Sequence, residues 1–462
     1  MSTGGILKLN WITKYNDILP SVVVLTFSFS AEWPITDWVK RESATLEYVT
    51  KVKNSLHSRD IKLILVPFRT GGGSHDVYED RINAMKKRFQ LDGRHLIVVA
   101  TTDLSPPGTT TIKRLSKTVR EFSMSYYVTH AKRVRNIEKS VKATEPTLIA
   151  RYNFKVSFLS EFQGQTARAL RHYRTAYSAL AALYDEAVQQ ILPETNTDTS
   201  VYEQAKAVAE WINFKICMLY LKSNSLKEAS QQLRGHITAF SKPVPGSSLW
   251  GHYAWVSDQY VIFAQTLDVC STDPTLMDAD RSYYYQNAAL FATKRQSTFH
   301  GIKKSTEANI EAEHSLSHKY KGMVVTSPKY VGGPPQLHDP VLDIESNNNE
   351  TDIKAIVDYL QRSSERKVDH KSLIIDLLKS ALDALGPLQK RRRAMIRYQM
   401  AKQFMIQGKY ELASMNLNPG IEILSKDNWS KPLVAMLRKK MACALYLGRA
   451  REYVVAALRL IA

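Results

Sequence analysis

The spacing of apolar residues changes once along this chain of 462 residues, near residue 110. Before that point three short apolar runs, "SVVVLTFSF", "IKLILVPF" and "HLIVVAT", alternate with two segments of helical spacing. Continuous apolar strands separated by helices are typical of a parallel sheet with both faces covered. The sequence therefore predicts an α/β N-terminal head over residues 1–110, built on a small parallel sheet.

After residue 110, helical patterns follow one another to Ala462, and we find no convincing strand. We expect a mostly α, tetratricopeptide-like α-solenoid in two parts, residues 111–325 and residues 351–462. Between them, proline, glycine and asparagine dominate residues 326–350. Such a composition indicates a flexible linker or insertion.

One motif recurs within the helical part. In "EFQGQTARALRHYRTAY", a glycine precedes small and aromatic residues at helical spacing. In tetratricopeptide-type hairpins a glycine turn joins two helices, and a small residue lets them approach closely. "FMIQGKYELASMNL" repeats the motif, "LKSNSLKEASQQL" repeats it with Asn224 at the turn, and "YLGRAREYVVAAL" is a weaker copy around Gly448. The residues that we predict to pack the helices are Gly164, Ala169, Tyr173, Ala229, Gly408 and Ala413.

The charge balance favours acidic partners. The chain has 63 Lys and Arg against 44 Asp and Glu, a net charge of +19, which suits nucleic acid, anionic lipid or an acidic protein face. The densest basic cluster is the candidate contact for an acidic partner or a membrane, and a solvated helix face is an equal alternative. It comprises Lys390, Arg391, Arg392 and Arg393, with Arg397 one turn further on.

Signals for catalysis are weak. Gly71 to Gly73 lie between a strand and a helix, where a phosphate can bind, but the loop lacks a Lys-Ser/Thr ending and GxGxxG spacing. His314 and His318 share a helix face without the HExxH pattern, so a solvated face is the better interpretation. No GxSxG motif occurs. We predict no enzyme, catalytic residue, cofactor, metal site or small-molecule substrate.

The cysteines and the apolar runs bear on location. Cys217, Cys270 and Cys443 lie far apart and cannot close a disulfide framework, which predicts a cytoplasmic protein. The first residues lack the pattern of a signal peptide. The longest apolar run is about half of what spans a bilayer as a helix.

Several segments resemble a known family. They are "NFKVSFLSEFQGQTARALRHYRTAY", "WINFKICMLYL", "YYYQNAALFATKRQ", "GKYELA", "GILKLNWITKYNDILPSVVVLTF" and "EFSMSYYVTHAKRVR". In collinear order over most of the chain, they are similar to the foie gras region of subunit 11 of the transport protein particle complex. Family members have extra sequence before the position of Gly5 and a β-rich region beyond that of Ala462. The resemblance therefore implies that this chain is a fragment or a shortened form.

The resemblance implies a scaffold subunit of a multisubunit vesicle tether in endoplasmic reticulum-to-Golgi transport and autophagy. The complex activates a Rab-type GTPase through its small core subunits, so the expected partners are other subunits and, indirectly, that GTPase and the Golgi membrane. The expected location is cytoplasmic and peripheral, at Golgi and intermediate membranes. The alternative function is a basic helical-repeat protein that binds nucleic acid or anionic membrane directly, and a steep loss of binding with salt would distinguish it.

Overall fold

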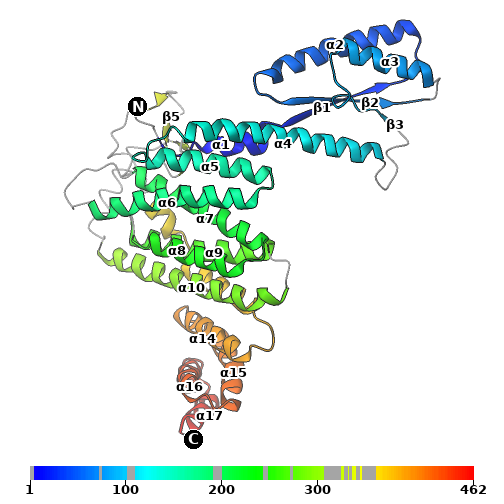
Figure 1. Cartoon of the computed structure of the whole chain (residues 1–462). Coiled ribbons are helices and arrows are strands. Elements are labelled where there is room, and N and C mark those ends of the chain that lie inside the picture. Colours follow the sequence, from blue (N-terminus) through cyan, green and yellow to red (C-terminus); the bar gives the residue numbers. More distant parts are fainter. Residues whose placement is uncertain are drawn as a thin grey trace. The chain divides into compact units, whose positions relative to one another are not determined.

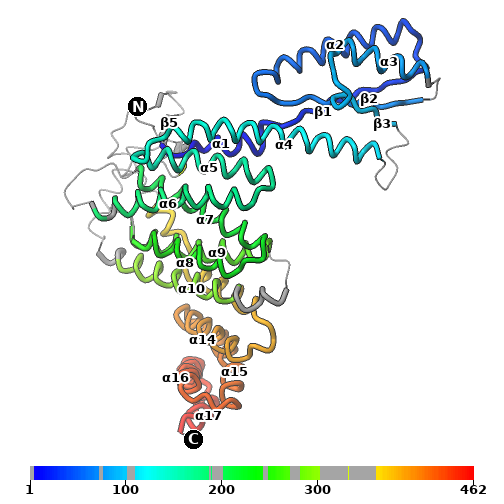
Figure 2. The backbone as a smooth tube through the Cα atoms, in the orientation of Figure 1, coloured from blue at the N-terminus to red at the C-terminus, as the bar shows by residue number. Residues whose placement is uncertain are grey.

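A computed structural model shows that the chain forms two compact units, Leu7–Ala179 and Met1–Ile6 with Leu180–Ala462. Figure 1 labels the elements, and Figure 2 traces the backbone in the same view. The residues described are 5–71, 75–100, 110–190, 200–242, 248–270, 274–305, 324–326, 331, 336–339, 344–345 and 361–461.

The first unit is built on the predicted small sheet. Strands β1 (Val22–Phe29), β2 (Lys62–Arg69) and β3 (Val99–Ala100) pair in parallel in the order β1-β2-β3. The register runs from Val22 opposite Lys62 to Phe29 opposite Arg69. Helices α2 (Ile35–His57) and α3 (His75–Arg88) connect the strands as expected.

Both faces of this sheet are covered (Figure 1). Leu63 and Leu65 of β2 join the apolar core that includes α2 and α3. Ile64 and Val66 point to the opposite face, where they pack with Phe122 of α4 (Thr110–Glu138). Alternate residues of a strand face opposite sides of a sheet, so the continuous apolar run of β2 reflects burial on both. The rest of the unit comprises α1 (Leu9–Thr13), the π-helical turn η1 (Lys14–Ile18), α5 (Pro146–Phe162) and the first part of α6 (Thr166–Gln190).

The second unit is largely helical, and the predicted class, an α/β head followed by a helical solenoid, is confirmed. Its core is formed by apolar residues of consecutive helices, among them Ala288, Ile374, Ala394, Leu417 and Met436. The helices after α6 whose bounds the structure describes are α7 (Ser200–Lys222), α8 (Leu226–Ala239), α9 (Leu249–Cys270), α10 (Pro274–Ser305), α13 (His370–Asp383), α14 (Lys390–Ile406), α15 (Tyr410–Lys426), α16 (Ser430–Tyr446) and α17 (Ala450–Ile461).

Five of the turns between helices share one backbone geometry. A residue with positive φ follows the helix, and its neighbour's amide reaches back to the last turn. At Gly408, the Gly408 amide donates to the Met405 carbonyl (3.0 Å) and the Lys409 amide to the Phe404 carbonyl (2.9 Å). This is the Schellman motif, which satisfies carbonyls at a helix end. The same pair of bonds and a positive φ occur at Gly164, Asn224, Asn428 and Gly448.

The last four helices are regularly spaced. They begin at Lys390, Tyr410, Ser430 and Ala450, one every 20 residues. Asn428 supplies the turn between α15 and α16, a position that the sequence analysis did not identify. Asparagine tolerates the left-handed conformation better than other non-glycine residues, so it can take the place of glycine there.

The prediction that no strand follows residue 110 is wrong. Strands β4 (Val324–Thr326), β5 (Gln336–Asp339) and β6 (Ile344–Glu345) form an antiparallel sheet in that order. Each has two to four residues, too few for an alternating pattern to be visible in the sequence. Most of residues 326–350 lie outside the described part of the chain, so the linker interpretation and the four predicted segment limits stay predictions.

Candidate interaction site on the helical array

The predicted helix-packing residues lie at buried contacts and turns. Ala169, Tyr173, Ala229 and Ala413 have no exposed surface. The Tyr173 hydroxyl donates a hydrogen bond to the Glu161 carboxylate across the turn at Gly164. Burial and this neighbouring carboxylate raise the Tyr173 pKa well above its usual value. Gly164 and Gly408 have φ of +67° and +73°, which glycine adopts without steric cost. These positions suit the predicted packing role, which itself stays a prediction.

Two members of the predicted basic cluster have partners on neighbouring parts of the chain. Arg393 lies at the start of α14, and its Nη1 donates to the carbonyls of Leu382 (3.1 Å) and Leu385 (2.6 Å) at the end of α13. The last carbonyls of a helix have no intrahelical partner, so the guanidinium of Arg393 caps α13. Arg391 pairs with Asp427 (2.6 Å).

The other members of the cluster differ in exposure. Lys390 and Arg392 are exposed, and Arg397 is half-buried. The side chain of Arg392 donates to Gln389 Oε1 (2.9 Å). With Arg391, the cluster has three exposed cations, and its contact with an acidic partner or membrane stays a prediction.

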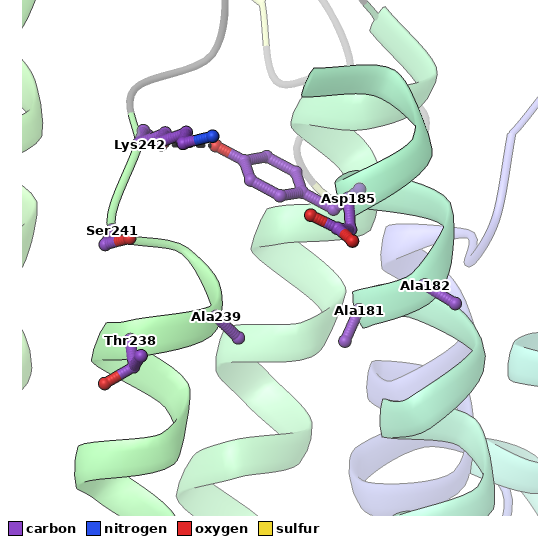
Figure 3. Close-up of a pocket in the computed structure, with 8 residues that line it drawn as sticks. Ala181, Ala182, Asp185, Thr238, Ala239, Ser241 and Lys242 are labelled. Atoms are coloured by element: carbon purple, nitrogen blue, oxygen red, sulfur yellow. Dashed lines mark hydrogen bonds between the residues drawn. The ribbon is translucent and has the colours of Figure 1, made fainter. Parts of the chain in front are cut away.

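A groove lies between the end of α6 and the end of α8 (Figure 3). Its volume is about 400 Å³, and the Tyr184 hydroxyl closes one side by donating to the Lys242 carbonyl (2.6 Å). The lining combines small side chains with one carboxylate, one ammonium group and hydroxyls, without a nucleophile and base in contact. The lining residues are Ala181, Ala182, Tyr184, Asp185, Thr238, Ala239, Ser241 and Lys242.

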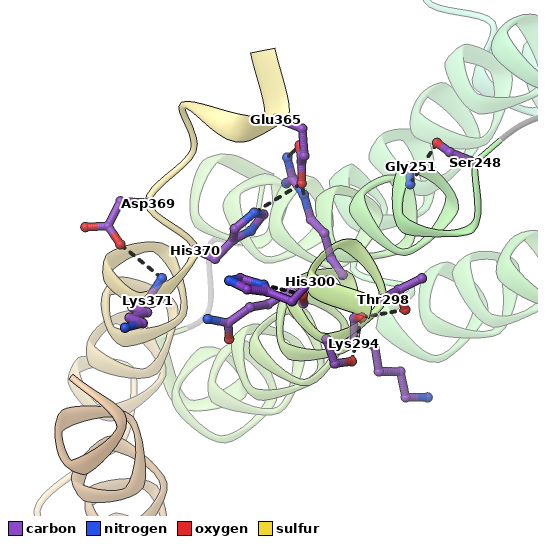
Figure 4. A network of polar contacts seen from close by, with 12 residues as sticks. Ser248, Gly251, Lys294, Thr298, His300, Glu365, Asp369, His370 and Lys371 are labelled. Atoms are coloured by element: carbon purple, nitrogen blue, oxygen red, sulfur yellow. Dashed lines mark hydrogen bonds and ion pairs between the residues drawn. The ribbon is translucent and has the colours of Figure 1, made fainter. Parts of the chain in front are cut away.

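A buried ion pair joins α10 to the segment before α13 (Figure 4). Arg295 binds Glu365 through two parallel hydrogen bonds, with Nε to Oε1 at 2.6 Å. The Glu365 side chain is 3% exposed and that of Arg295 is 15% exposed. Glu365 raises the Arg295 pKa, whereas burial lowers the pKa of His370, whose Nε2 lies 3.4 Å from Glu365. We call Arg295 and Glu365 the clasp.

A second group of buried titratable residues surrounds Trp255. The Lys206 ammonium lies 4.0 Å from the ring centroid, and the indole Nε1 donates to Glu210 (2.9 Å). Burial lowers the pKa of Lys206 to about 8, of His236 to about 3 and of His252 to about 4. Both imidazoles are therefore neutral at pH 7. We interpret the group as buried polar side chains that belong to the core of the second unit.

The described residues offer little for phosphate or metal chemistry. Gly71 has φ of +82°, and a side chain there would lie 2.8 Å from the Glu32 carboxylate, whose charge opposes phosphate binding. Gly72, Gly73, His314 and His318 lie outside the described residues. Within those residues, no group of three or more His, Cys, Asp and Glu side chains is placed to hold a metal ion.

Two further observations concern the cysteines and the helices. Cys217, Cys270 and Cys443 are buried free thiols. Among the described helices, none combines the length and the apolar composition that crossing a membrane requires.

Comparison with known proteins gives two family matches. Residues 202–462 match the model of foie gras liver health family 1, and residues 3–106 match the N-terminal domain of trafficking protein particle complex subunit 11. Trafficking protein particle complex subunit 11 of Bos taurus is 26% identical over 468 residues, and that of Homo sapiens is 26% identical over 466 residues. Each alignment covers 99% of this chain and 39% of the relative, so the chain spans about two fifths of their length.

The foie gras match covers more than half of the chain, including all the described helices from α8 to α17 and nearly all of α7. The N-terminal match covers the sheet and the helices α2 and α3. The chain therefore belongs to the foie gras family.

Proposed function

We propose that this protein is a non-catalytic scaffold subunit of a multisubunit vesicle-tethering complex, the trafficking protein particle complex. The observation that carries the proposal is the alignment of 99% of the chain with relatives named as subunit 11 of that complex. The helical array supports it, because stacked helical hairpins expose extended surfaces to partner proteins.

The finer proposals follow from the same relationship. The complex would act in endoplasmic reticulum-to-Golgi transport and in autophagy. The protein would contact other subunits directly, and a Rab-type GTPase and the Golgi membrane only indirectly. Its location would be cytoplasmic and peripheral at Golgi and intermediate membranes. No step in this function needs a cofactor, a small-molecule substrate or a specific nucleic acid.

Within the chain, we propose that residues 1–110 act as the α/β head and that the two solenoid parts, 111–325 and 351–462, carry the subunit contacts. Exposed apolar side chains in the last helices support a contact role for the second part. Leu445, Val454, Leu458 and Ile461 are between 53% and 83% exposed. Aliphatic side chains exposed close together often mark protein interfaces.

Affinity purification of the tagged chain from cells, followed by quantitative mass spectrometry, tests the proposal. We expect the other trafficking protein particle subunits among the enriched proteins, with little loss when the wash is raised from 0.15 to about 0.5 M salt. An interface with an apolar core is insensitive to salt, whereas binding to nucleic acid phosphates weakens steeply. Enrichment of nucleic acid or membrane without those subunits, lost at high salt, would favour the alternative function.

A variant with Val454→Glu and Leu458→Glu tests the contact surface separately. These changes place charge on the exposed face of α17 without entering the core, where Ala456 is the fully buried residue. We expect reduced recovery of partner subunits with unchanged folding. The matched control, Glu79→Lys and Asp80→Lys, makes two charge changes on α3 in the other unit and should leave recovery unchanged.

A further inference from the structure

In the first unit, Lys155 lies over the half-buried ring of Trp11, and three further cations act on its ammonium group. Trp11 of α1 and Lys14, the first residue of η1, are three residues apart, and Lys8 is the extended residue that precedes α1. Residues at this spacing share a helix face. The Lys155 ammonium of α5 lies 5.3 Å from the Trp11 ring centroid and 5.7 Å from that of Tyr152.

The packing of Trp11 holds this arrangement in place. Its ring meets Phe158 edge-on at 5.4 Å between centroids and Phe154 at 6.1 Å, so the tryptophan face of α1 lies against α5. Arg151 lies one turn before Lys155 on α5. Three residues after Trp11, at Lys14, the helix widens into the π-helical turn η1. Such single-turn widenings occur frequently at functional sites.

Within the described part of the chain, no carboxylate is among the groups that shift the Lys155 pKa. The charged groups that influence it are Arg151, Lys8 and Lys14, all cationic. Burial, and then these cations, lower the Lys155 pKa to about 8. A half-buried ammonium group among like charges is unfavourable unless a counter-charge joins it. The aromatic rings of Trp11 and Tyr152 supply only a partial substitute through cation–π contact.

We propose that Lys8, Lys14, Arg151 and Lys155 form a binding site for a phosphate-bearing anion, with Trp11 as its floor. Lys8 and Lys14 are exposed, and Lys155 and Trp11 are half-buried, so the site opens to solvent and has a fixed base. Ammonium groups bind phosphate as compact point charges without demanding a single geometry. A phosphorylated lipid headgroup and a soluble phosphate compound share this chemistry.

Two probes distinguish a phosphorylated lipid headgroup from a soluble phosphate compound as the ligand. Calorimetric titration with pyrophosphate tests a soluble ligand, and flotation with phosphatidylcholine vesicles that contain about one tenth phosphatidylinositol phosphate tests a headgroup. We expect saturable binding of at least one probe. Vesicles with an equal charge as phosphatidylserine should bind about tenfold less, because their headgroup offers a single phosphodiester charge.

Variants locate the site. Lys155→Gln and the pair Lys8→Gln with Lys14→Gln should each weaken binding tenfold or more. The matched control is Lys40→Gln with Lys53→Gln, two exposed lysines of α2 that lower the net charge by the same amount. It should change binding less than twofold. Equal loss in the two double variants would mean that net charge alone attracts the anion and would overturn the site.

Folding controls keep the result interpretable. Lys155→Gln removes a repelled charge, so its unfolding midpoint without ligand should equal or exceed that of the wild type. If Lys155→Gln unfolds at a lower temperature than the wild type, the aliphatic stem of Lys155 contributes to packing. The test of the binding site then rests on the variant with Lys8→Gln and Lys14→Gln, because both lysines are exposed. Absence of binding to both probes would overturn the proposal.

Discussion

The clasp between Arg295 and Glu365 gives the sharpest stability prediction. Replacing Glu365 with Ala leaves the Arg295 guanidinium buried without its bidentate partner. Removing one partner of a buried ion pair costs about 3–5 kcal/mol, since the remaining charge is uncompensated. Burial raises the Asp258 pKa and Arg295 lowers it, so this second carboxylate attracts the guanidinium and should reduce the cost. We expect Glu365→Ala to lower the free energy of unfolding by about 3 kcal/mol.

A double-mutant cycle separates the pair from its surroundings. Arg295→Met together with Glu365→Met replaces both charges with apolar groups, which is often neutral or stabilising at buried pairs. We expect the double variant to lie within about 1 kcal/mol of the wild type and above Glu365→Ala. The coupling energy should reach about 2 kcal/mol, as is usual for residues in direct contact.

Hydrogen exchange measured at increasing urea gives a local readout in α10 and α13, which matters because the two units can unfold separately. The control is Asp376→Ala, which removes an exposed pair with Lys379 on α13 (2.9 Å). Exposed pairs contribute about 0–1 kcal/mol. If Glu365→Ala costs no more than Asp376→Ala, the clasp does not hold the segment before α13 to α10.

Three further predictions concern packing, turns and pH. Ala229→Trp should cost about 1–3 kcal/mol in a denaturation experiment because Ala229 is fully buried, whereas Ala239→Trp at an exposed position of the same helix should leave the midpoint unchanged. Asn428→Gly should match or exceed the wild-type stability, and Asn428→Ala should lose about 1 kcal/mol because alanine disfavours positive φ; equal midpoints would argue against the turn. Burial holds the His236 pKa at about 3 and the His252 pKa at about 4, so below about pH 6.5 only the unfolded state takes up these protons, and stability should fall from pH 6.5 towards pH 4 by up to about 1.4 kcal/mol per pH unit and histidine. His252→Asn should reduce that slope, and an unchanged slope would contradict the assignment.

The parts of the fold that depend on residues close together in the sequence could be predicted. The strands β1 and β2 were visible as apolar runs, and Gly164 and Gly408 marked turns because glycine there adopts positive φ. Asn428 was missed because asparagine occurs in many exposed positions that are not turns. The strands β4 to β6 were missed because they are too short to show a period.

The parts that depend on tertiary contacts could not be predicted. Arg393 belongs to a run of four cations, and only the packing of α14 on α13 shows that it caps carbonyls of the preceding helix. Lys155 and Trp11 lie far apart in the sequence, and α1 must pack on α5 before the cations around them meet. In both cases the sequence shows the charged residue but does not show which residues it contacts.

Native size fractionation of the tagged chain from cell extract tests the central claim most directly. The chain should co-migrate with the other trafficking protein particle subunits in one large assembly, at 0.15 and about 0.5 M salt and after nuclease treatment, because subunit contacts with an apolar core do not depend on phosphate charge. Migration at the size of the free chain, or an assembly that dissolves with salt or nuclease, would contradict its assignment as a scaffold subunit.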